Sequence, residues 1–103
     1  DILGLRTQPL TEEMRERLGF EPEQKGVIVS EVEFNSPADK AGIRAGDIIV
    51  RVGKEPVESM DDFSRLMKDQ AQPGSSVLIR MYRGEEIPTV VVLKVPDDYN
   101  PQQ

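Results

Sequence analysis

The side chains that could support catalysis in this chain of 103 residues are almost entirely carboxylates. Two neighbouring acids can act as general acid and base when their surroundings push their pKa values apart. Here the adjacent acids lie in polar stretches typical of a solvated surface: Glu12 with Glu13, Asp61 with Asp62, Glu85 with Glu86, and Asp97 with Asp98. The chain has no histidine and no cysteine, so a Ser-His-Asp or Cys-His site cannot form within it and the usual zinc ligands are absent. We therefore expect no catalytic site, no metal and no other cofactor.

The charge balance narrows the class of partner. There are 13 basic and 19 acidic residues, which gives a net charge of −6. An acidic chain is poorly suited to nucleic acid or to an anionic membrane as its main partner. No apolar run approaches the ~18 residues that span a bilayer, so membrane insertion is not expected. The length supports one domain with a modest core.

The most specific stretch of sequence begins at Ser36, which can cap a helical turn that has Pro37 at its first position. Gly42 is placed to end that turn, because glycine tolerates the left-handed backbone found there. Gly46 begins a second tight turn, and residues 48–52, apolar except for Arg51, follow as a buried strand.

Periodicity and turn residues predict the other elements. Thr11 is a suitable cap for a helix that ends at Gly19, and Ser59 for a longer helix that ends before Pro73. In the strand 26–32, alternation places Val27 and Val29 on one face, with Glu31 as a further candidate for that face. The other expected strands are 2–7, 56–57, 77–82 and 89–95, with a hairpin turn at 83–86. About six short strands and two or three helices predict an α+β, mainly β fold: an open or partly closed antiparallel barrel capped by helices.

The order of capped turn, glycine stop, glycine turn and strand resembles the core signature of PDZ domains. Leu3-Gly4-Leu5 at the start, Leu10-Thr11, the helix ending at Leu18-Gly19, and residues 25–29 are similar to the PDZ domains of HtrA/Deg-type serine endoproteases. The resemblance covers residues 2–95 and is somewhat closer to the second, C-terminal PDZ domain of that family. It implies a circularly permuted bacterial-type PDZ fold for residues 1–96, with 97–103 as a tail or linker.

The same resemblance implies a peptide-binding site at the segment Ile2-Leu3-Gly4-Leu5, although glycine there could also mark a simple β-bulge. In PDZ domains such a loop aims backbone amides at a peptide's terminal carboxylate. The implied donors are the amides of Leu3, Gly4 and Leu5. The backbone of Leu5, Arg6 and Thr7 would pair with the peptide as an added strand.

Side chains on the long helix complete the implied site. Leu3 and Leu5 would form the floor of a pocket for the last peptide side chain, and Met60, Ser64 and Met67 its other wall. An alternative leaves Met60 and Met67 in the core and Ser64 on the helix surface. We expect Leu5→Asp or Gly4→Val to abolish peptide binding in a domain that stays folded.

By resemblance, the chain is a piece of a longer protein: a periplasmic, homo-oligomeric serine endopeptidase of protein quality control. The module would bind C-termini or extended segments of unfolded or substrate proteins, beside a protease domain in the same chain. Two alternatives remain open. The module could be a subunit-assembly element of the protease oligomer, or the PDZ domain of a membrane-embedded protease or secretion component.

Overall fold

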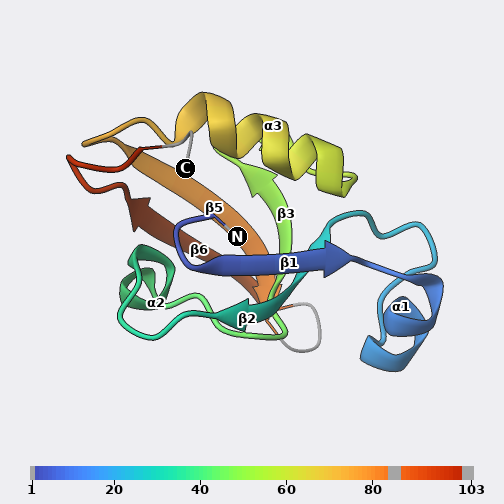
Figure 1. The fold of residues 1–103 in the computed structure, drawn as a ribbon. Coiled ribbons are helices and arrows are strands. Elements are labelled where there is room, and N and C mark those ends of the chain that lie inside the picture. The colour runs from blue at the N-terminus through green and yellow to red at the C-terminus, as the bar shows by residue number, and fades with distance from the viewer. Residues whose placement is uncertain (1, 84–86, 101–103) are drawn as a thin grey trace.

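The computed structural model describes residues 2–83 and 87–100. Within that part of the chain, a six-stranded antiparallel sheet carries three helices (Figure 1). The strand order is β1-β2-β3-β5-β6, and β4 pairs with β3. The elements in chain order are β1 (Leu5–Pro9), α1 (Glu12–Leu18), β2 (Val27–Val32), α2 (Pro37–Ala41), β3 (Ile48–Val52), β4 (Glu55–Pro56), α3 (Met60–Gln70), β5 (Ser76–Arg83) and β6 (Ile87–Lys94). The predicted α+β, mainly β architecture is confirmed, as an open sheet.

Each helix begins where a hydroxyl side chain can accept a hydrogen bond from a free backbone amide. The hydroxyls of all three predicted N-cap residues do so at 3.1–3.2 Å: Thr11 accepts from Met14, Ser36 from Asp39, and Ser59 from Asp62. Gly19 and Gly42 end the first two helices with φ angles of 79° and 91°. These helix boundaries follow directly from local sequence.

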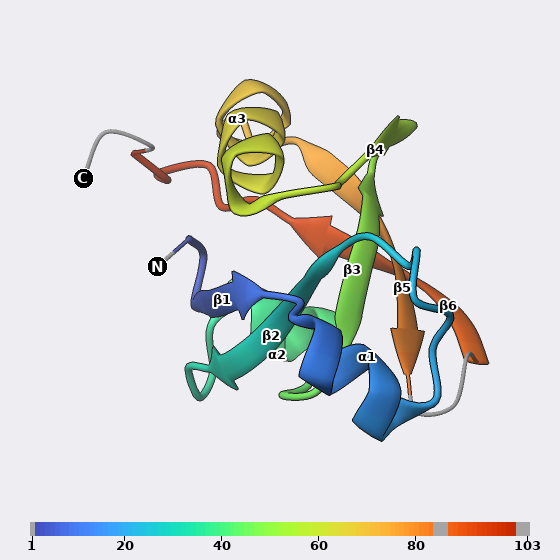
Figure 2. The same ribbon diagram turned by 90° about the vertical axis from the view of Figure 1, so that its right-hand side faces the viewer.

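The core lies between the inner face of the sheet and α3. That helix buries Phe63, Leu66 and Met67 on one side, as its amphipathic spacing requires. The strands contribute apolar residues that are at most 2 % exposed, among them Leu5, Val27, Val29, Ile49, Val52, Ile79, Met81 and Leu93. In Figure 2, α3 lies above the sheet, and β1 lies below α3.

The pairing of β1 with β2 contains an irregularity that changes which residues face the core. The register runs from Arg6 opposite Glu31 directly to Thr7 opposite Val29, which leaves Ser30 as an extra residue on β2. Such a bulge shifts the alternation of side chains along the strand. Glu31 is consequently exposed, whereas Val29 is buried. The candidate placement of Glu31 on the face of Val29 is therefore wrong.

Two further expectations are changed by the structure. The predicted strand 2–7 begins only at Leu5, because Leu3 and Gly4 have positive φ angles and turn the chain; it continues to Pro9. Tyr99, in the predicted tail, is half-buried and packs against the core. The hairpin turn expected at 83–86 falls largely outside the described residues, and the domain boundary after residue 96 stays a prediction.

Candidate functional site

One edge of the sheet is formed by β1. Among the described residues, β1 pairs with β2 on one side, and on its other side only Leu5 forms a bridge, to Ile2. The other side of β1 faces α3 (Figures 1 and 2). An edge strand presents backbone N–H and C=O groups that can pair with another chain. The geometry of this site is therefore that of a short edge strand beside a helix.

The chain enters β1 through a two-residue turn that occupies part of this edge. The N–H of Ile2 donates to the carbonyl of Leu5 at 3.0 Å, and the N–H of Leu5 donates to the carbonyl of Ile2 at 2.8 Å. Between them, Leu3 and Gly4 have φ angles of 55° and 89°, which is the pattern of a tight type I′ hairpin turn. Both backbone groups of Leu5 are thus paired within the chain.

The amides of Leu3 and Gly4 have no hydrogen-bond partner among the described residues. Their neighbouring carbonyls are held: Ala38 donates to the carbonyl of Leu3 at 3.2 Å, and Glu33 to the carbonyl of Gly4 at 2.8 Å. Because a trans peptide unit points its C=O and N–H in opposite directions, the first of these bonds fixes the Gly4 amide away from α2. Two fixed, unpaired amides in succession form a small anion-binding concavity.

Hydrogen exchange measured by NMR gives a direct check of this loop. After correction for intrinsic rates, we expect the exchange rate of the Leu5 amide to be at least about ten times lower than that of the Gly4 amide. The reason is that only the Leu5 amide donates a hydrogen bond. The amide of Arg15, which is bonded to Thr11 within α1 at 3.0 Å, serves as a reference for a protected group. Equal exchange at Leu5 and Gly4 would contradict the turn.

Gly4 also contacts α2. A β-carbon added at Gly4 would overlap Cβ and Oγ of Ser36, the residue that caps α2. The loop and the helix cap therefore pack without room for a side chain at this position. Sequence reasoning identified Ser36 as a cap but missed this contact, since nothing local links residues 32 positions apart.

The predicted pocket residues lie on the loop before β1, on β1 and on α3, and their exposure is unequal. Leu3, Leu5 and Met67 are buried, at 8 %, 1 % and 0 % exposure. Met60 is half-buried, and Ser64 is exposed. The full burial of Met67 fits the alternative that places this residue in the core. The side chain of a bound peptide would reach the half-buried Met60 first.

Between β1 and α3, the hydroxyl of Thr7 lies 3.5 Å from the sulfur of Met60. This contact joins β1 to the first turn of α3 and fills the space between them at that end. Methionine is flexible enough to move aside for a ligand. Peptide entry would then require Met60 to change rotamer.

The backbone and side chain of Arg6 are not oriented as the expected pairing with a peptide requires. Its carbonyl accepts from the hydroxyl of Ser30 on β2 at 3.0 Å, and its guanidinium pairs with Glu31 at 3.1 Å. Alternation along a strand turns the backbone groups of Leu5 and Thr7 toward the free edge and those of Arg6 toward β2. Pairing of an added strand with Arg6 is therefore not supported, and Leu5 and Thr7 are the positions left for it.

The two variants expected to abolish binding in a folded domain do not meet that condition. Leu5 is in the core, so Leu5→Asp would bury an unpaired carboxylate. Gly4→Val would overlap Ser36. Both substitutions are expected to damage the fold, so neither isolates peptide binding.

Among the described residues, no group of three or more acidic side chains is arranged to hold a metal ion. No helix in the described part of the chain is long and apolar enough to cross a membrane.

Comparison with known families identifies this fold. The family profile described as "PDZ domain" matches residues 3–93. The chain therefore belongs to the PDZ domain family.

Relatives and solved structures agree with the resemblance to HtrA/Deg proteins. The chain is 35 % identical over 85 residues to a protein of Chlamydia pneumoniae and 36 % identical over 99 residues to one of Brucella suis, both named "Probable periplasmic serine endoprotease DegP-like". These alignments cover 82 % and 93 % of this chain but only 17 % and 19 % of the relatives. The chain thus spans less than a fifth of the relatives' length, and their names agree with the expected periplasmic location.

Two similar structures contain peptides. The HtrA-type protease AlgW with a decapeptide has a TM-score of 0.74 and 27 % identity, over 91 % of this chain and 28 % of that one. The HtrA3 PDZ domain bound to the phage-derived ligand FGRWV has a TM-score of 0.72 and 26 % identity, over 90 % of this chain and 82 % of that one. The recognition of an HtrA-type PDZ domain from sequence is confirmed.

Proposed function

We propose that this chain is the peptide-binding module of an HtrA/Deg-type serine endoprotease, and that it takes C-terminal or extended segments of substrate proteins as a strand beside β1. The observation that supports this most is the edge of β1 facing α3, with the unpaired amides of Leu3 and Gly4 at its start. The peptide complexes of similar PDZ-containing proteins support the same ligand class.

The geometry suggests an order of events for capture. The terminal carboxylate would first accept from Leu3 and Gly4, because those two N–H groups need not break another bond. The peptide backbone would then compete with Ile2 for the N–H and C=O of Leu5, and extend the pairing to Thr7. Ile2 thus acts as an internal competitor that a ligand must displace.

The side chains that flank the edge of β1 suggest the preferred peptide. An apolar last residue would lie against Leu3 and Met60, and the flexibility of a methionine side chain favours loose selection among apolar residues. Ser64, exposed on α3, would face the third residue from the peptide's C-terminus, and its small hydroxyl supports weak selection there.

In the parent protein, the module would serve a protease domain of the same chain in a homo-oligomer. Holding a substrate segment close to the active site raises its effective concentration there. A peptide that binds two states of the enzyme unequally would also shift their populations. Either effect makes this chain a regulator of proteolysis and not a catalyst.

Isothermal titration calorimetry with the pentapeptide FGRWV and its C-terminal amide tests the dependence on a carboxylate. We expect the amide to bind about tenfold or more weakly, because hydrogen bonds to a charged group contribute roughly 1.5–3 kcal/mol each and amidation removes the charge. Equal affinities would mean that the Leu3–Gly4 loop does not capture a carboxylate, and would leave strand addition alone.

A further inference from the structure

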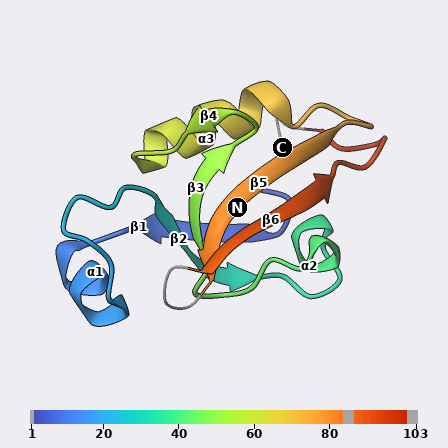
Figure 3. The same ribbon diagram turned by 180° about the vertical axis from the view of Figure 1, so that it is seen from behind.

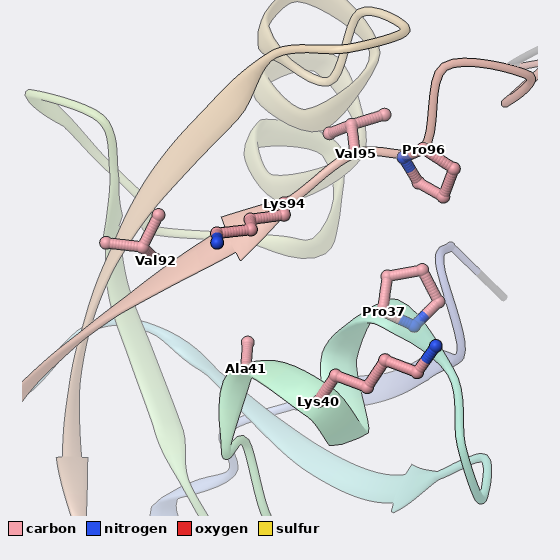
Figure 4. A pocket seen from close by; sticks show the side chains of 7 residues that line it. All are labelled: Pro37, Lys40, Ala41, Val92, Lys94, Val95 and Pro96. Carbon is pink, nitrogen blue, oxygen red and sulfur yellow. The ribbon is translucent and has the colours of Figure 1, made fainter.

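A second concave surface lies at the opposite edge of the sheet, between α2 and the end of β6 (Figures 3 and 4). It is a cavity of about 410 Å³. One wall is formed by Pro37, Lys40 and Ala41 of α2, and the other mainly by Val92, Lys94 and Val95. None of these residues belongs to the site beside β1.

An exposed apolar strip continues from this cavity across the outer face of the sheet. Leu78, Val90 and Val92 are 51 %, 55 % and 46 % exposed. Leu78 lies opposite Val92 in the β5–β6 ladder, and Val90 is two residues before Val92, so all three side chains share one face. Adjacent exposed apolar residues on a small domain are a common mark of a binding surface.

Basic side chains border the same strip. Lys40 and Lys94 line the cavity, and Arg80 lies opposite Val90. All three are exposed, and none has an ion-pair partner among the described residues. Three unpaired cations around an apolar strip are a local exception on a chain with a net charge of −6.

Nearby acids do not neutralise this group in the structure. The carboxylate of Asp39, next to Lys40, accepts from the backbone N–H of Asn35 at 2.7 Å. The carboxylate of Asp97 lies beside Gly74. The cations are therefore available to an acidic ligand.

We propose that the β6 face, defined as Lys40, Leu78, Arg80, Val90, Val92 and Lys94, is a second binding site for an extended partner segment that carries acidic and apolar residues at every second position, so that both kinds lie on the same side of the segment. Charge complementarity selects acidic residues, and the apolar strip selects apolar ones. β6 ends the strand order, so an extended segment can follow its outer edge or face. A second copy placed by a twofold axis would bring like charges together, which disfavours self-association here.

The test is an NMR titration of the whole chain with the blocked peptide Ac-ESVSE-NH2 and, separately, Ac-KSVSK-NH2. Neither peptide has a terminal carboxylate for the Leu3–Gly4 loop. We expect Ac-ESVSE-NH2 to shift the amides of Ala41, Val92, Lys94 and Val95, and Ac-KSVSK-NH2 to leave them unchanged.

A charge-reversal pair supplies the matched control. The double variant Lys40→Glu/Lys94→Glu should weaken Ac-ESVSE-NH2 binding about tenfold or more. Lys25→Glu/Lys68→Glu changes the net charge equally in the loop before β2 and on α3, away from the face, and should bind almost as tightly as the unaltered chain. Equal weakening in both variants would overturn the site, because only overall charge would then matter.

Other outcomes also decide the proposal. No shifts on the β6 face at millimolar Ac-ESVSE-NH2, or equal shifts with Ac-KSVSK-NH2, would overturn it. Shifts on this face when the domain alone is concentrated would mean that a second copy occupies it. Binding of FGRWV should be unaffected by Lys40→Glu/Lys94→Glu, so the β1 site and the β6 face can fail independently.

Discussion

Replacing Asp47 with alanine is expected to lower the free energy of unfolding by about 3 kcal/mol, the lower end for removing one partner of a buried ion pair. Asp47 is 2 % exposed. Its two carboxylate oxygens accept from Nε and Nη2 of Arg83 at 3.0 and 2.8 Å. One of them also accepts from the backbone N–H of Arg44 at 2.8 Å. The hydrogen bond to Asp47 raises the pKa of Arg83. Without Asp47 the guanidinium loses this contribution but remains charged at neutral pH, because arginine is protonated there even without a partner.

Asp47 joins the turn before β3 to the end of β5, which explains the size of this effect. In the variant, Arg83 would keep only its bond to the carbonyl of Gly42 at 2.7 Å, and the Arg44 amide would lose its acceptor. Because the Arg83 side chain is about one-third exposed, water can solvate part of its charge, which limits the loss.

Glu31→Ala is the matched control, since it also removes the acid of an arginine–carboxylate pair. Both side chains of the Arg6–Glu31 pair are 63 % exposed, so the expected change is at most about 1 kcal/mol. Urea denaturation followed by circular dichroism measures both variants. Similar losses from Asp47→Ala and Glu31→Ala would contradict the importance assigned to burial.

Replacing Gly4 with alanine is expected to cost about 2–4 kcal/mol of stability, and to weaken FGRWV binding about tenfold or more at a temperature where the variant is folded. The new β-carbon would overlap Ser36, in a backbone with a φ of 89° that alanine rarely adopts. Relief of the overlap must move the loop or the α2 cap. Either movement redirects the amides of Leu3 and Gly4.

Gly19→Ala separates the effect of backbone strain from that of the contact. Gly19 has a φ of 79°, close to that of Gly4, but a β-carbon there would meet no atom within 4 Å. We expect a loss of about 1 kcal/mol and no change in peptide affinity. Thermal denaturation and calorimetry provide the two readouts, and equal behaviour of the two variants would show that the Ser36 contact carries no weight.

Features set by neighbouring residues were predictable from the sequence. Thr11, Ser36 and Ser59 cap helices because hydroxyl side chains bind the free amides that follow them, whatever the fold. The glycine stops at Gly19 and Gly42 follow in the same way from backbone sterics.

Features set by pairing between distant segments were not predictable in this way. The bulge at Ser30 depends on the register between β1 and β2, and it reversed the expected side of Glu31. The contact of Gly4 with Ser36 and the pairing of Asp47 with Arg83 also join segments far apart in the chain. No local pattern encodes them.

The candidate site was likewise predictable from the sequence only in part. Resemblance supplied the residues on either side of the β1 edge, from Leu3 on the loop to Met60 on α3. It did not supply the Ile2–Leu5 pairing, which depends on the turn geometry actually adopted. The internal competitor and the unequal roles of the three loop amides therefore emerged only from the structure.

The most direct test of the central claim is the NMR titration of this chain with FGRWV, observed at the backbone amides. We predict large shifts at Leu3, Gly4 and Thr7, together with loss of the Ile2–Leu5 hydrogen bonds, and little change on the β6 face. Peptide capture at the edge of β1 would be contradicted if the amides of Leu3, Gly4 and Thr7 did not shift, whether or not amides on other surfaces did.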